Sequence, residues 1–305
     1  MSNNSVVSFK KNIVNVDGDL IYYLVADIGG TNCRLSLIDS NYSIIKKKSI
    51  SHLNFYDELF DFYNKYSAKF NISKICIGVA GLVKDSCVKL TNVDLFISLS
   101  KLKSLLSFDE IYLVNDYELM AYSLNNVAEL SSVKIISKST SSSKSTGPKL
   151  LVGVGTGLGA SVLVGNSVLR SEAHLLELNF PISDSLTSIE DVVSGRGIIN
   201  IYKKLHCSVV SIDSAVCDVL VQNFFSRTFA KLLKNLTYIY LPSEIYLYGG
   251  VLQKSSFLLG KFFLSEFFRH YDPSISEFLK TIDIKLIEDY DFSLKAGVFF
   301  LKTTV

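Results

Sequence analysis

Residues 26–34 read ADIGGTNCR and lie between two apolar runs, YYLV before them and LSLI after them. A strand that ends at Asp27 is expected to turn here and to resume as a second strand. Paired glycines allow backbone N–H groups to approach a ligand closely, and hydroxyl and amide side chains add donors. The turn is therefore predicted to bind phosphate groups through Gly29, Gly30, Thr31 and Asn32. Asp27 is placed to hold Mg²⁺, directly or through a water, and a tight hairpin without a ligand is the alternative.

Further strands are expected around this turn. Runs rich in Val, Ile, Leu and Tyr, bounded by polar or glycine-containing turns, lie at 20–29, 32–39, 44–51, 74–83 and 110–116. An apolar stripe with helical spacing at 55–66 lies between the third and fourth runs, with Asn54 as its candidate cap. This order predicts a mixed sheet covered by helices.

A second glycine-rich string, GVGTGLGA at 153–160, repeats the glycine–hydroxyl–glycine pattern between two apolar runs. No Lys-Ser/Thr pair follows and no clear helix opens after it, so it is neither a Walker P-loop nor a Rossmann fingerprint. Alone, the string is typical of an ordinary hairpin. Paired with the first turn, Gly155, Thr156 and Gly157 are predicted to hold a triphosphate from the other side.

The candidate catalytic group is a carboxylate at the end of a buried strand. EIYLVNDYELMAYSL (110–124) is an apolar strand that delivers Asn115 and Asp116 just before a helix starting near Tyr117. Carboxyl ends of sheet strands border ligand clefts. A partly desolvated carboxylate there can accept the proton of a sugar hydroxyl as that oxygen attacks the γ-phosphorus. Asp116 can instead cap the helix, and the two roles are compatible.

The remaining sequence predicts a second α/β half. Strands are expected within 150–165, 244–250 and 282–289, and helices within 188–205, 214–241, 257–271 and 293–304. The Ser/Thr/Lys-rich residues 137–149 carry nothing to bury and predict a flexible loop. Gly249 and Gly250, in EIYLYGGVLQ, would let the backbone approach a flat adenine or would simply form a strand-to-helix turn.

Composition narrows the class of protein. The chain of 305 residues has 31 Lys and Arg against 29 Asp and Glu, so by count it offers no basic surface for nucleic acid or an anionic membrane. Five cysteines without a Cys-x-x-Cys pair predict neither a disulfide scaffold nor a zinc site. Residues 1–19 lack the apolar run of a signal peptide. The uncharged residues 150–169 contain five glycines, which favours two strands over a membrane helix.

In order and spacing, the four strings resemble the bacterial-type glucokinase family of the hexokinase/actin-like ATPase superfamily, from about Leu24 to the C-terminus. The family's first phosphate motif, Asp-x-Gly-Gly-Thr-Asn-x-Arg, is complete at 27–34. Five other segments are also similar to motifs of the family. Residues 78–92 resemble its Ala-Gly-Pro-Val to Leu-Thr-Asn segment, and residues 114–122 resemble its Asn-Asp string. Residues 153–161 resemble its second phosphate motif, residues 188–202 its sugar-binding helix, and residues 248–252 its adenosine motif.

The resemblance implies an α/β, two-domain actin/hexokinase-like (ribonuclease H-like) fold with an interdomain cleft. Residues 20–117 and 291–305 would form a small domain, residues 118–290 a large one, and residues 1–19 an N-terminal extension. The implied activity is cytoplasmic, ATP- and Mg²⁺-dependent phosphorylation of glucose to glucose 6-phosphate. The implied partner is a hexose, with neither nucleic acid nor membrane, and a homodimer is left open.

Roles for individual residues also follow from the resemblance. Asp116 would be the general base, and the two glycine turns would bind the phosphates of ATP. Gly249 and Gly250 would contact the adenosine. The residues implied to contact the sugar outside the divergent loop are Asn92, Asn115, Asp116 and Glu190.

One sugar-binding loop departs from the family pattern. The family's Glu-Gly-Gly-His-x-Asp-Phe loop should lie between Leu169 and Phe180, where this chain has RSEAHLLELNF without either glycine. The family's Glu/His pair is then either Glu172 with His174 at a shortened spacing, or His174 and Glu177 with their identities swapped. This divergence motivates two alternatives to a glucose kinase: a kinase for another hexose or an aminosugar, or a catalytically impaired sugar- or nucleotide-binding relative.

Overall fold

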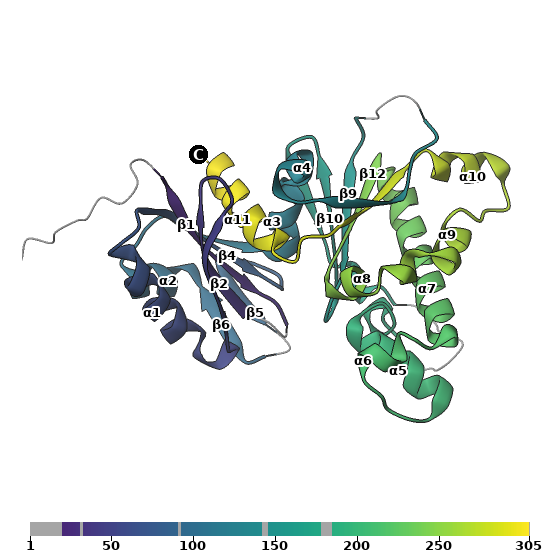
Figure 1. The fold of residues 1–305 in the computed structure, drawn as a ribbon, viewed down its shortest axis with the longest axis horizontal. Coiled ribbons are helices and arrows are strands. Elements are labelled where there is room, and N and C mark those ends of the chain that lie inside the picture. Colours follow the sequence, from purple (N-terminus) through teal and green to yellow (C-terminus); the bar gives the residue numbers. More distant parts are fainter. Residues whose placement is uncertain (1–19, 31–32, 91–92, 142–145, 178–184, 305) are drawn as a thin grey trace, which may run out of the picture.

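The computed structural model describes residues 20–30, 33–90, 93–141, 146–177 and 185–304. They form two lobes, each built around its own β-sheet (Figure 1). Residues 1–19, Thr31, Asn32, Asn92 and part of the 137–149 loop, for which predictions were made, lie outside the described residues. Among the described helices, none is long and apolar enough to cross a membrane.

The first lobe contains a five-stranded sheet in the order β3-β2-β1-β4-β7. β1, β2 and β3 form an antiparallel meander, whereas β1, β4 and β7 are parallel. Two helices, α1 and α2, and a short β5-β6 ribbon that the sequence did not predict complete this lobe. The bounds are β1 (Tyr22–Ile28), β2 (Cys33–Asp39), β3 (Ile44–Ile50), α1 (Phe55–Ser67), β4 (Ile72–Val79), β5 (Cys87–Leu90), β6 (Leu95–Ser98), α2 (Leu99–Leu106) and β7 (Ile111–Asn115).

Strands β1, β2 and β4 of this first sheet are buried on both faces, which explains their continuous apolar runs. Successive side chains of a strand point to opposite faces. Accordingly, Leu24 and Ala26 pack with α1 and α2, whereas Val25 packs with the C-terminal helix α11 (Phe292–Thr303). The β1 strand thus contributes to two separate hydrophobic clusters.

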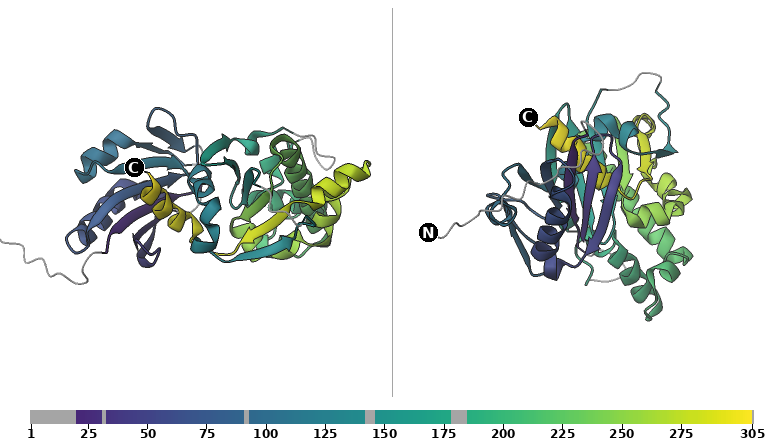
Figure 2. Two further views of the ribbon diagram at one scale, coloured as in Figure 1. Left: turned by 90° about the horizontal axis from the view of Figure 1, so that it is seen from above. Right: turned by 60° about the vertical axis from the view of Figure 1, so that its left-hand side comes forward.

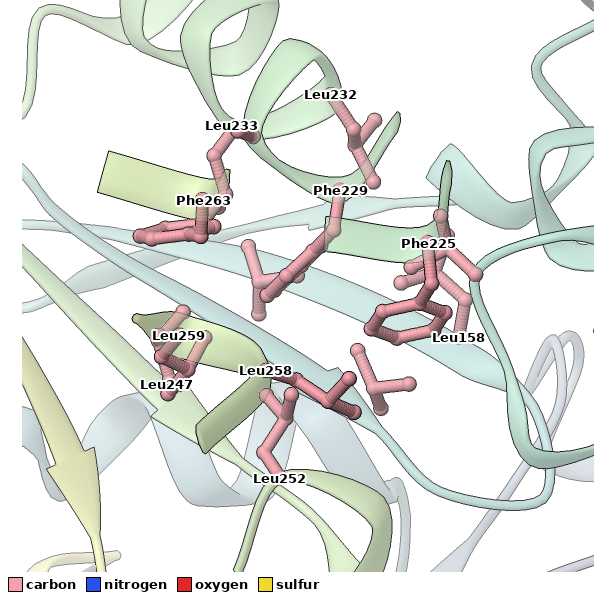
Figure 3. Packing of buried hydrophobic residues seen from close by; sticks show 14 of the residues in the cluster. Leu158, Phe225, Phe229, Leu232, Leu233, Leu247, Leu252, Leu258, Leu259 and Phe263 are labelled. Atoms are coloured by element: carbon pink, nitrogen blue, oxygen red, sulfur yellow. The ribbon is translucent and has the colours of Figure 1, made fainter. Parts of the chain in front are cut away.

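The second lobe contains a six-stranded sheet in the order β11-β10-β9-β12-β13-β8. One face packs on α5, α7 and α9, and Figure 3 shows Phe225, Phe229 and Phe263 together in that core. The bounds are β8 (Val133–Ser137), β9 (Lys149–Val154), β10 (Leu158–Val164), β11 (Ser167–Ser171), α5 (Gly195–His206), α6 (Ile212–Ala215), α7 (Val219–Tyr240), β12 (Glu244–Tyr248), α8 (Gly250–Lys254), α9 (Lys261–Phe267), α10 (Pro273–Lys280) and β13 (Asp283–Ile287).

Helices α3 (Asp116–Tyr122) and α11 lie side by side between the two sheets, with the short α4 (Val127–Leu130) close by (Figure 2). Leu294 of α11 belongs to a cluster with the first sheet. Phe292 of the same helix joins Met120 of α3 in a cluster with the second sheet. The predicted domain boundary at 117/118 falls inside α3, and that boundary stays a prediction.

The helix predicted for 214–241 is wrong at its N-terminal end. Asp218 accepts hydrogen bonds from the N–H groups of Leu220 (2.9 Å) and Val221 (3.0 Å), and this cap starts a new helix, α7, at Val219. The segment before the cap contains the separate helix α6. Residues 257–271 are also interrupted, because α9 begins only after Gly260.

Candidate active site

A cavity of about 570 Å³ between the lobes is lined by residues from both sheets. It gathers side chains and glycines that are far apart in the sequence and that the sequence singled out for phosphate, sugar or adenosine binding. Those residues are Asp27, Gly29, Gly30, Asn115, Asp116, Gly155, Thr156, Gly157, Glu172, His174, Glu190, Gly249 and Gly250. Glu177 is not among the described residues that line this cavity.

Asp27, at the end of β1, is held by charge and hydrogen bonds. It lies opposite Arg34 in the β1–β2 register, and the two side chains form an ion pair. Ser293 of α11 donates a hydrogen bond to the same Asp27 oxygen, Oδ2, at 2.8 Å. Arg34 also donates to Asp291 Oδ1 at 3.1 Å and to the carbonyl of Tyr290 at 3.0 Å. The first glycine turn is therefore joined to the start of α11.

His52 supports the same turn from the segment that follows β3. Its ring atom Nε2 lies 2.7 Å from the carbonyl oxygen of Gly29. Because a carbonyl can only accept, His52 must carry a proton on Nε2 to make this hydrogen bond. His52 is not among the predicted site residues, because a single histidine 23 residues from the turn carries no local signal.

Asn115, and not Asp116, caps helix α3. The Asn115 Oδ1 accepts hydrogen bonds from the N–H groups of Tyr117 and Glu118, both at 3.0 Å, and its Nδ2 donates to the carbonyl of Gly81 at 3.0 Å. The interpretation of Asp116 as the N-cap is therefore wrong. The side chain of Asn115 fixes the strand-to-helix turn that holds Asp116 at the cavity wall.

Burial raises the pKa of the Asp116 carboxyl to about 7. The nearby negative charges of Asp27 and, more weakly, Glu172 act in the same direction, whereas the N–H of Tyr117, 3.0 Å from Oδ1, opposes the shift. A carboxyl group with a pKa near neutrality is well matched to accepting a proton during a reaction. Asp116 is thus the described carboxylate in the cavity best suited to act as a base.

The second glycine turn joins β9 to β10 and is tied to the main chain of another segment. The N–H of Gly195 donates to the carbonyl of Gly155 at 2.8 Å. Glu190 Oε2 accepts from the N–H of Leu158 at 3.0 Å, and its Oε1 pairs with Arg196 at 2.7 Å. Glu190, which is predicted to contact the sugar, therefore supports the second glycine turn.

The divergent loop places two of its three candidate side chains at the cavity. Glu172 and His174 both line it, and their side chains lie 3.3 Å apart, with His174 Nδ1 facing Glu172 Oε2. Glu177 instead forms an isolated β-bridge with Ser188 and borders a separate hollow beside α7. Leu175 lies in the sequence between His174 and Glu177, is 63% exposed and lines the cavity between the lobes.

Gly249 forms the turn from β12 to α8 and has φ +106°. A Cβ on Gly249 would lie 2.4 Å from the carbonyl oxygen of Val154, so the strand-to-helix turn itself requires glycine. The neighbouring Gly250 has open space where its Cβ would be. Tyr117, Tyr248 and Ser293 also line the cavity, although none of them is among the predicted site residues.

Comparison with known proteins identifies relatives of the whole arrangement. A family model described as Glucokinase matches residues 24–213. The glucokinase of Erwinia tasmaniensis is 30% identical over 204 residues, which span 60% of this chain and 62% of that enzyme. A glucokinase-like protein of Xylella fastidiosa is 26% identical, covering 87% of this chain and 90% of that protein.

The fold is shared with solved structures. The crystal structure of the Balamuthia mandrillaris glucokinase, in complex with glucose, superposes with a TM-score of 0.76 at 20% identity. The match covers 93% of this chain and 94% of that one. This likeness confirms the two-domain α/β fold that the family resemblance implied.

Proposed function

This chain belongs to the glucokinase family, and on that premise we propose that it transfers the γ-phosphoryl group of ATP to the 6-hydroxyl of glucose. The observation that carries the proposal is the composition of one cavity. It contains a half-buried carboxylate with a raised pKa, Asp116, together with two glycine turns supplied by different lobes. The family model matches residues 24–213, and the alignment with the Erwinia tasmaniensis enzyme covers 62% of that protein, so the activity and the substrate are argued from this site.

The cavity wall suits a nucleoside triphosphate. A Cβ built on Gly155 or Gly250 would meet no atom within 4 Å, so both backbones border open space that phosphate or adenosine can enter. The described residues hold no cluster of three or more metal-ligating side chains. That fits Mg²⁺, which usually keeps its waters and binds through one or two carboxylates plus substrate phosphates. Asp27 would hold it, and the ion would neutralise charge on the phosphates.

Asp116 performs the proton step. With the sugar bound, its carboxylate accepts the proton of the 6-hydroxyl while that oxygen forms a bond to the γ-phosphorus and the bond to the β-phosphate oxygen breaks. ADP leaves with the electrons of that broken bond. Asn115 keeps Asp116 at the end of β7, and Glu172, His174 and Glu190 surround the sugar. Closure of the lobes excludes water, so that the sugar hydroxyl receives the phosphoryl group.

A coupled assay of ADP release with a panel of hexoses tests this proposal. Glucose should give the highest kcat/KM, and ADP release without sugar should be negligible. Glucose binding by calorimetry without ADP release would instead favour the impaired relative. An equal rate with and without sugar would contradict the proposal.

The altered loop favours a second candidate, phosphorylation of another hexose or an aminosugar. Leu175 exposes an apolar side chain to the cavity beside Glu172 and His174. An apolar group there can contact a substituent, such as an N-acyl methyl, that glucose lacks. The same panel should include N-acylated aminosugars, and a higher kcat/KM with one of them would select this candidate.

A further inference from the structure

Two glycines of the second glycine-rich string contact an aromatic ring rather than open space. Gly153 of β9 and Gly159 of β10 are directly opposite each other in the antiparallel register. A Cβ built on Gly153 would lie 2.2 Å from the Tyr117 hydroxyl oxygen and 2.6 Å from its Cε1. A Cβ on Gly159 would lie 2.0 Å from Cε2 on the other edge of the same ring.

The Tyr117 ring therefore lies across both glycines. Any side chain at either position would have to displace it, because heavy atoms do not approach this closely. Gly155, two residues from Gly153 on the same strand–turn segment, has open space where its Cβ would be. The string thus has two structural roles. Gly153 and Gly159 pack against the Tyr117 ring, and residues 155–157 form the turn at the cavity.

Tyr117 follows Asp116 directly, at the start of α3. That helix packs against α11 on one side and against β10 on the other. The first sheet supplies Asp116 through the end of β7, and the second sheet supplies the Gly155–Gly157 turn. The seated ring is thus a contact between the element that carries the base and the sheet that carries the turn.

We propose that Tyr117 is a positioning residue, whose ring on Gly153 and Gly159 fixes Asp116 relative to the second glycine turn. The inference rests on the proposed function, because it assigns Tyr117 a role in placing that base. A displacement of about 1 Å between reacting groups can lower a rate by about a hundredfold. The ring, not its hydroxyl, makes most of the contact, so phenylalanine should serve nearly as well.

A double-mutant cycle tests the contact. Tyr117→Ala and Gly159→Ala should each lower kcat by about 10- to 100-fold, with the KM for ATP changed by less than about threefold. In the double variant the added methyl group no longer meets a ring, so its kcat should be no lower than that of Tyr117→Ala alone. Tyr117→Phe should keep most of the activity of the unmodified chain. Additive losses, or a harmless Gly159→Ala, would overturn the proposal.

A pH profile separates positioning from mere packing. Asp116 already lines the cavity, and removal of the neighbouring ring should expose it further to water, so the acid limb of kcat/KM should move to lower pH by about one unit in Tyr117→Ala but not in Tyr117→Phe. An unchanged limb in Tyr117→Ala contradicts positioning of the base. Tyr63→Ala, a partly buried tyrosine of α1 packed near Phe108, is the matched control and should shift neither kcat nor the limb.

Thermal unfolding tests the contact without any measurement of activity. The four proteins compared are the unmodified chain, Tyr117→Ala, Gly159→Ala and the double variant. Gly159→Ala should lower Tm in the presence of the ring and leave it nearly unchanged in the Tyr117→Ala background. This result, with no sugar phosphorylated by the unmodified chain, would remove the proposed function and the role of the ring in it, but keep the contact. If Tyr117→Ala does not fold, Tyr117→Leu replaces it, and an activity equal to that of Tyr117→Phe would overturn the need for a ring.

Discussion

The two glycine turns look alike in sequence but are supported by different interactions. In the first, Asp27 and Arg34 lie seven residues apart and pair across the hairpin, and Ser293 and Asp291 extend the network to α11. In the second, support comes from Glu190 and the N–H of Gly195, more than 30 residues along the chain. The first turn depends on a partly buried charge network, and the second on hydrogen bonds that involve main-chain N–H groups.

This difference matters because charge networks and main-chain bonds respond differently to mutation. Removing one partner of a partly buried ion pair leaves the other partner desolvated and uncompensated. Replacing a carboxylate that only accepts from an N–H group leaves that hydrogen bond intact if the new side chain can also accept. The first turn should therefore be the more sensitive of the two to a single substitution.

The largest expected effect is that of replacing Asp116, which belongs to neither glycine turn. Asp116→Asn should lower kcat by at least about 10²- to 10⁴-fold, because the amide cannot accept the proton. If the turns alone bind the nucleotide, its dissociation constant should change by less than about threefold. Rapid-quench kinetics and calorimetric ATP titration measure the two quantities. Retained turnover would remove Asp116 from the mechanism.

The next effect is the pH dependence of Asp116. Since its carboxylate must be ionised, kcat/KM should fall about tenfold for each pH unit below about 7, its pKa. The pKa is raised in the folded state, so the stability linked to this group is fully present below its ordinary pKa and is lost as pH rises through about 7. Asp116→Asn should consequently raise Tm more at pH 8 than at pH 4. A flat rate profile between pH 5 and 8 would contradict this.

Arg34→Met tests the charge network of the first turn. It leaves Asp27 without the guanidinium that pairs with it, whereas Asp291 keeps Lys47, and we expect the free energy of unfolding to fall by ~1–3 kcal/mol. The KM for ATP should rise in parallel. Urea unfolding measures the first quantity. Arg269→Met is the control, since this exposed arginine pairs with a Glu266 that keeps Arg227, and a change of less than ~1 kcal/mol is expected.

Glu190→Gln should have the smallest effect on stability. The amide oxygen can still accept from the N–H of Leu158, and only the exposed pair with Arg196 is lost, so the expected change is below ~1 kcal/mol. The KM for the sugar should rise more than the KM for ATP. A loss of stability as large as that of Arg34→Met would erase the distinction between the turns.

Much of the fold followed from the sequence because the physical signals were local. Strands buried on both faces, such as β1 and β4, give unbroken apolar runs that stand out in any sequence. The short β8 and β11 were less visible, since their side chains are mostly exposed or half-buried. The break before α7 was missed because Asp218 is one polar residue within an otherwise helical pattern.

The site was predictable only as far as its motifs were. Asn115 and Asp116 are adjacent and both residue types cap helices well, so the predicted cap, Asp116, lies one residue after the observed one, Asn115. Gly153 and Gly159 belong to one predicted phosphate-binding string, and nothing in that string indicates that the ring of Tyr117 packs against them. Contacts between distant segments, such as Ser293 with Asp27, leave no local pattern.

The return of α11 to the first sheet has a consequence during biosynthesis. Val25 and Cys76 are made early, but the helix that covers them, with Leu294 and Val298, is made more than 200 residues later. At ~5–20 residues per second, a ribosome needs on the order of tens of seconds to supply it. Until then one face of the nascent sheet is bare, and a chaperone that shields apolar strands has its main opportunity in that interval.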